Sequence, residues 1–234
     1  MVQCAPRPRP PARPPVVLHL LDIVGTFAFA LSGAFRAVRH ELDLLGVAAL
    51  AVATGVGGGL VRDVLLGLTP PLVLVDQRYA LVCVAGALVT FCAAPRIARR
   101  WDLVLAADAV GLAVFTAIGA ARAESVDAVP LTVVLMATLT ACGGGVIRDL
   151  LVNEVPAVLT HDFYASAALL GGTVFVVLGG VAVDEDLRIA VTIAVTLAAR
   201  VLAMRLRFGL PRVRALPQSP SQLTRARKTR HDDQ

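Results

Sequence analysis

The sequence predicts an all-α membrane protein with seven transmembrane helices, built as a 3+3 inverted repeat plus one C-terminal helix. The first observation is composition: 57 % of the 234 residues are hydrophobic and 17 % are charged, whereas soluble domains carry about 25 % charged residues. The second is a series of separate apolar stretches close to bilayer length. The third is an internal duplication at a fixed offset.

The elements are justified in chain order. Residues 1–15 hold six prolines and three arginines, which predicts a disordered tail. Apolar runs then predict spans at about residues 16–35, 42–61, 79–94, 102–121, 129–147, 163–181 and 187–206. The first repeat occupies residues 16–100, the second 101–186 and the seventh helix 187–208. The basic, polar residues 209–234 predict a second disordered tail.

The duplication is explicit in the letters. GGGLVRD at 57–63 recurs as GGGVIRD at 143–149, an offset of 86 residues, and the same offset maps Asp22 onto Asp108. Between residues 22 and 37, eight of sixteen positions are identical across the shift. Each repeat holds three predicted spans, and an odd number makes the second copy enter the membrane from the opposite side. The halves are therefore expected to be related by an axis in the membrane plane.

The positive charges predict the orientation. The side that carries the N-terminal tail holds seven arginines, and the other side holds fourteen basic residues, six of them in the C-terminal tail. The positive-inside rule places the C-terminus in the cytoplasm and the N-terminus outside, in a multi-pass plasma-membrane protein. Because the basic residues set the orientation in the membrane, the isoelectric point of about 9.6 does not indicate a nucleic-acid partner.

The glycine triplets are the strongest candidates for a functional site. Three consecutive glycines release the backbone, and the sequence predicts that they break the second and fifth spans and expose backbone groups to an enclosed polar cavity. The alternative is close packing of two helices, which small residues permit. The candidate pore or substrate residues of this motif are Gly57, Gly58, Gly59, Gly143, Gly144 and Gly145.

The charges after each triplet are the second group of candidates. Arg62 and Asp63, like Arg148 and Asp149, lie one turn beyond the glycines. Charged side chains within a membrane are costly, so they are expected to line a pore or substrate site, or to pair and brace the helices. Two further carboxylates, at equivalent positions near the start of the first and fourth spans, are expected at a vestibule or hydrogen-bonded to a neighbouring helix: Asp22 and Asp108.

Enzyme chemistry is not indicated. The chain has no nucleophile–base pairing and no phosphate-binding loop, and its cysteines and histidines lack metal-ligand spacing. We therefore expect no enzyme activity, no cofactor and no metal site.

The doubled Gly-Gly-Gly-x-x-Arg-Asp at 57–63 and 143–149, with Asp-x-x-Gly at 22–25 and 108–111, resembles the prokaryotic branch of the trimeric intracellular cation (TRIC) channel family. The resemblance covers about residues 16–206. It implies a homotrimer with a pore in each protomer, lined mainly by the second and fifth helices, that conducts monovalent cations, mostly potassium, and binds membrane lipid. Some bacterial relatives are regarded as glycine transporters, so glycine is the alternative substrate.

Overall fold

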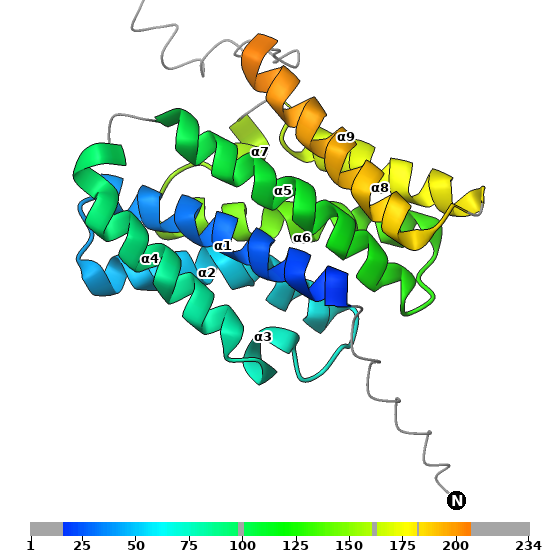
Figure 1. The fold of residues 1–234 in the computed structure, drawn as a ribbon, viewed down its shortest axis with the longest axis horizontal. Helices are drawn as coiled ribbons and strands as arrows, with labels where there is room; N and C mark the ends of the chain where they lie inside the picture. The colour runs from blue at the N-terminus through cyan, green and yellow to red at the C-terminus, as the bar shows by residue number, and fades with distance from the viewer. Residues whose placement is uncertain (1–15, 98–100, 161–162, 182, 207–234) are drawn as a thin grey trace, which may run out of the picture.

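The structure is a computed structural model that describes residues 16–97, 101–160, 163–181 and 183–206. The two predicted disordered tails, residues 1–15 and 209–234, lie outside these residues. Within the described part every regular element is helical (Figure 1). The helices are α1 Val16–Arg39, α2 Leu44–Leu65, α3 Leu72–Val75, α4 Arg78–Ile97, α5 Trp101–Glu124, α6 Pro130–Leu151, α7 Ala157–Thr160, α8 Ala165–Gly180 and α9 Glu185–Leu206.

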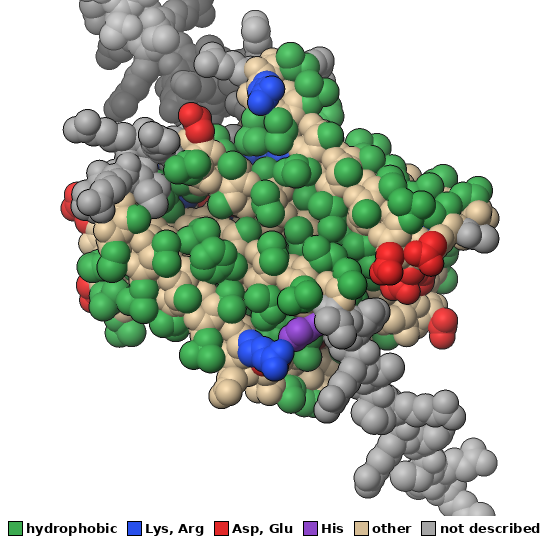
Figure 2. All heavy atoms as spheres, viewed as in Figure 1, with side chains coloured by type: hydrophobic (Ala, Val, Ile, Leu, Met, Phe, Trp, Pro, Cys, Tyr) green, Lys and Arg blue, Asp and Glu red, His purple; other side chains and the backbone are tan. Residues whose placement is uncertain are grey.

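The protein is an all-helical membrane protein, as predicted. Five of its helices, α1, α2, α5, α6 and α9, are long and apolar enough to cross a bilayer, and α4 and α8 contain shorter apolar segments. The outer surface suits lipid, because large apolar side chains such as Leu20, Leu81 and Leu103 are half or more exposed. Figure 2 shows such side chains over most of one face, with the charged groups near its margins. A water-soluble protein rarely exposes an apolar surface of this extent.

Helices α1 and α5 form the centre of the bundle. α5 packs against α1, α6, α8 and α9, and α1 packs against α2, α4 and α5. Phe29 of α1 and Phe115 of α5, which occupy equivalent positions in the duplication, stack with ring centroids 5.4 Å apart. Both rings are almost fully buried, so this pair joins the two repeats at the core.

The predicted helix breaks are wrong. α2 runs without interruption from Leu44 to Leu65 and α6 from Pro130 to Leu151, each through its glycine triplet. Glycine costs a helix only about 1 kcal/mol relative to alanine. An unsatisfied backbone group in lipid costs several kcal/mol, so the intact hydrogen-bonded helix is favoured within a membrane.

The glycines instead allow α2 and α6 to touch through their backbones. A Cβ atom on Gly58 would collide with the carbonyl oxygen of Thr140, and one on Gly144 with that of Thr54. A Cβ on Gly143 would lie 3.1 Å from the Cα of Gly58. This contact is the close helix–helix packing that the sequence left as the alternative.

Candidate functional site

The two Arg-Asp pairs lie toward opposite ends of the bundle. Asp22, near the start of α1, interacts electrostatically with Arg62, whereas Ser32, ten residues further along the same helix, bonds to Arg148. Ten helical residues span about 15 Å. We call the two groups the Arg62 cluster and the Arg148 cluster; the first contains Asp22, Arg62, Asp63 and Tyr79, and the second contains Ser32, Asp108, Arg148 and Asp149.

In the Arg62 cluster each charge has a partner. The Arg62 Nε donates to Asp63 Oδ1 at 2.8 Å, and Asp63 Oδ2 accepts from the backbone N–H of Leu72 at 3.1 Å. The Tyr79 hydroxyl donates to Asp22 Oδ2 at 2.9 Å. Arg62 is only 1 % exposed, so its charge depends on Asp63 and on the more distant Asp22 for compensation.

The Arg148 cluster repeats this arrangement and adds to it. Arg148 Nε donates to Asp149 Oδ1 at 2.8 Å, and Asp149 Oδ2 accepts from the N–H of Ala157 at 2.8 Å. The Arg148 Nη1 also donates to Asp108 and Ser32. One guanidinium therefore holds two buried carboxylates, and Asp108 here takes an arginine partner, where its counterpart Asp22 takes a tyrosine.

Two contacts to Glu154, one from Arg36 and one from His40, lie at the outer edge of the Arg148 cluster. Arg36 bonds to Glu154 at 2.8 Å and approaches Asp149 to 3.6 Å. His40 Nε2 lies 2.7 Å from Glu154 Oε1. Glu154 lies in the segment between α6 and α7, and these contacts connect that segment to the end of α1. Its side chain is partly exposed, so the contacts extend from the surface to the buried charges of the cluster.

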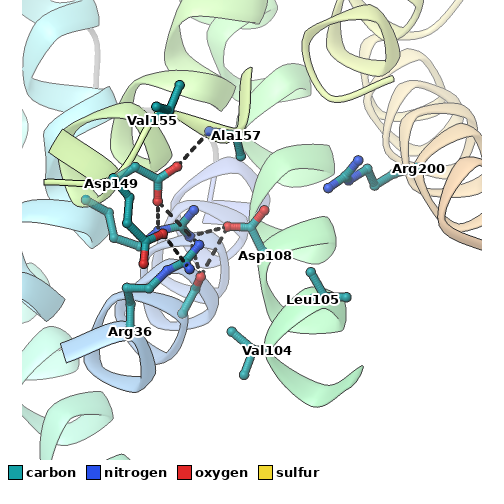
Figure 3. A pocket seen from close by; sticks show the side chains of 11 residues that line it. Arg36, Val104, Leu105, Asp108, Asp149, Val155, Ala157 and Arg200 are labelled. Atoms are coloured by element: carbon teal, nitrogen blue, oxygen red, sulfur yellow. Dashed lines mark hydrogen bonds and ion pairs between the residues drawn. The ribbon is translucent and has the colours of Figure 1, made fainter. Parts of the chain in front are cut away.

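A cavity of about 100 Å³ opens beside this cluster (Figure 3). Its charged and hydroxyl-bearing lining residues are Ser32, Arg36, Asp108, Arg148, Asp149, Glu154 and Arg200, and its remaining lining residues are Val104, Leu105, Val155 and Ala157. Three arginines and three carboxylates face a space large enough for a few water molecules. Such a site can take a cation at its carboxylates or a carboxylate at its arginines.

The structure brings together only part of the predicted site. Asp108, Arg148 and Asp149 share one cluster and line one cavity, and Arg62 and Asp63 pair at the other end near Asp22. Four of the six motif glycines, Gly57, Gly58, Gly143 and Gly144, lie at the α2–α6 contact, whereas an added Cβ would meet Arg62 at Gly59 and Tyr164 at Gly145. None of the six is among the residues that line this cavity. That they line a pore or substrate site stays a prediction.

Several residues of the site were not among the predicted ones. Ser32 aligns with Ile118 across the duplication, so repetition cannot identify it. Arg200 is an ionisable residue within an apolar span, a signal that by itself indicates function. Tyr79 and Tyr164 lie near the starts of α4 and α8, and only the fold places them beside the charges.

The comparisons with known proteins agree on one family, although they differ in the activity that they name. The family model described as "Glycine transporter" matches residues 19–95 and 105–179, the two repeats. A solved TRIC cation channel structure is 40 % identical, with a TM-score of 0.80, covering 86 % of this chain and 99 % of the other. The chain belongs to the TRIC channel family. The TRIC orthologue from Rhodobacter sphaeroides is 36 % identical with a TM-score of 0.80, covering 83 % of this chain and all of that one.

Curated relatives in the same family are described only as membrane proteins. A UPF0126 membrane protein of Deinococcus radiodurans is 46 % identical over 66 % of this chain and 73 % of its own length. One from Vibrio cholerae is 36 % identical over 83 % of this chain and 82 % of its own. This TRIC family member is therefore a multi-pass membrane protein.

Proposed function

We propose that the protein is a monovalent cation channel of the cell membrane, selective mainly for potassium, with one conduction path in each protomer of a homotrimer. The observation that carries the proposal is similarity to solved TRIC cation channels over nearly the whole bundle, at 36–40 % identity and with 98–100 % of each solved chain covered. The apolar outer surface is the part that contacts membrane lipid and the neighbouring protomers.

The proposed membrane arrangement has seven spanning helices, with α4 and α8 as the short ones, and inverted repeats of three. It rests on matched bonds: the Arg62–Asp63 and Arg148–Asp149 bonds are both 2.8 Å long. Each aspartate also accepts a backbone N–H from the short helix that follows, α3 or α7. Because the two clusters lie toward opposite ends of α1, the repeats point in opposite directions. The Arg148 cluster is then on the cytoplasmic side with the C-terminus.

The conduction path proposed here joins the two clusters past the α2–α6 contact. Asp22 and Asp108 mark its two vestibules, and Asp63 and Asp149 add negative charge at the same two ends. Each aspartate is held by an arginine or a tyrosine, so a passing cation competes with these partners, and loosening them opens the path.

Glycine transport is the second candidate. The specific observation in its favour is the cavity, where arginines and carboxylates face a small volume that suits both ends of a small zwitterion. In that case the Arg148 or Arg62 guanidinium binds the carboxylate by a charge-assisted hydrogen bond.

Potassium and glycine flux in proteoliposomes separates the two functions. For a channel, Asp63→Asn and Asp149→Asn should lower potassium conductance or selectivity, because losing about 1 kcal/mol of attraction lowers ion occupancy about fivefold. For a carrier, Arg62→Gln or Arg148→Gln should raise the apparent glycine constant. Asp127→Asn is the matched control, since Asp127 is exposed and its positive φ of 56° suits asparagine.

Wild-type potassium conductance in both aspartate variants would contradict the channel site. Unchanged glycine uptake in both arginine variants would contradict the carrier site. If all four variants keep both wild-type potassium conductance and wild-type glycine uptake, the two Arg–Asp pairs serve only to brace the helices.

A further inference from the structure

Arg200 of α9 is the one arginine of the cavity wall without an ion-pair or hydrogen-bond partner among the described residues. Only 5 % of the residue is exposed. The buried Nε has no hydrogen-bond partner among the described residues. The guanidinium lies 4.8 Å above the centroid of the Tyr164 ring. This cation–π contact is worth about 0.5–2 kcal/mol, less than the cost of a buried unpaired charge.

The three carboxylates of the cavity are already engaged on the opposite side. Asp108 and Asp149 both bond to Arg148, and Glu154 bonds to Arg36 and contacts His40. The arginines and carboxylates of the wall match in number, but their pairing leaves Arg200 compensated only from a distance. A charged group within a membrane segment normally pairs with a neighbour or marks a site for a ligand or ion.

The position of Arg200 favours a ligand. Figure 3 shows its side chain reaching from α9 toward the cavity, apart from the network around Asp108. Arg200 lines the same cavity of about 100 Å³, which has room for one small ion and some water. The free face of the guanidinium is therefore a donor surface next to solvent-sized space.

We propose that Arg200 binds a small monovalent anion in this cavity, either a halide or the carboxylate of a small solute. The guanidinium donates charge-assisted hydrogen bonds, and it offers a carboxylate two parallel ones. Arg148 adds a second positive charge on the far wall. The bound anion neutralises Arg200 and makes the cavity more attractive to cations, so it acts as a counter-charge in the path. The binding does not depend on which transport function is correct.

The test is anion-dependent thermal unfolding of the purified full chain in detergent. The unfolding midpoint is followed against sodium chloride, sodium acetate or glycine, with sodium gluconate holding the ionic strength constant because gluconate is too large for the cavity. The wild type should be stabilised with saturation. Arg200→Gln should lose this response, and Arg200→Lys should need about tenfold more acetate, because lysine lacks the planar pair of donors that matches a carboxylate.

Arg205→Gln is the matched control, because it removes the same charge from an exposed position of the same helix and should respond as the wild type does. A response to chloride identifies a halide site, and a response to acetate or glycine alone identifies a carboxylate site. The proposal is overturned if the wild type responds to none of the three, or if the Arg200 variant that folds responds at wild-type concentrations. Because the readout is binding, loss of potassium flux does not affect it.

Discussion

Replacing Gly144 with alanine is expected to push α6 away from α2 and to lower the stability of the protein sharply, although alanine is the better helix former. The added Cβ would meet the carbonyl oxygen of Thr54, a backbone atom that cannot rotate aside. Overpacking a well-packed core costs about 1–3 kcal/mol even where side chains adjust, so we expect a loss at or above that range. Gly58→Ala should behave in the same way through Thr140.

Gly180→Ala makes the same chemical change without the collision. Gly180 is the last residue of α8, and an added Cβ there would have no neighbour within 4 Å. Alanine should therefore leave the thermal midpoint unchanged or raise it slightly. Thermal unfolding in detergent, with size-exclusion chromatography to detect loss of the native oligomer, compares the three variants. A Gly144→Ala protein as stable as Gly180→Ala would show that the α2–α6 contact is not close-packed in solution.

The same glycines show why the sequence predicted the helices α2 and α6 but not that their backbones continue through the triplets. The doubled motif singled out residues 57–59 and 143–145, but a run of glycines is compatible with a broken helix, which was predicted, and with close packing of two helices, which was the alternative. Which of these two structures forms depends on the residues that the helix packs against in the folded protein. Here the carbonyl of Thr54 faces Gly144 and that of Thr140 faces Gly58, and no local pattern contains that information.

Repetition predicted the charged residues better than it predicted their partners. Arg62, Asp63, Arg148 and Asp149 were identified because they are duplicated, and all four are buried. The two clusters nevertheless differ, since Tyr79 holds Asp22 while Arg148 and Ser32 hold Asp108. Glu154 lies in a loop of the second repeat, at a position where the first repeat has Leu68. Arg200 lies in α9, outside both repeats. A duplicated pattern cannot identify residues that occur in only one copy or that come from outside both copies.

Replacing Arg148 with glutamine should be the most damaging single change at the charged clusters. It leaves two buried carboxylates, Asp108 and Asp149, without their shared cation. Removing one partner of a buried ion pair costs about 3–5 kcal/mol, and here one substitution affects two pairs. Arg62→Gln is the natural comparison, because Asp22 keeps its Tyr79 hydrogen bond and only Asp63 loses a direct partner. Its loss of unfolding free energy should be smaller.

A double-mutant cycle tests the cause of this difference. Adding Asp108→Asn to Arg148→Gln removes one of the stranded charges, so the double variant should regain part of the lost stability, with a coupling energy of about 0.5–3 kcal/mol. The free energy of unfolding is measured in mixed detergent micelles for the wild type, both single variants and the double variant. Strictly additive losses would mean that Asp108 does not depend on Arg148, and the remaining explanation would be the Asp149 pair alone. A coupling of this size shows that the charge of Asp108 depends on Arg148, as the conduction path proposed above requires.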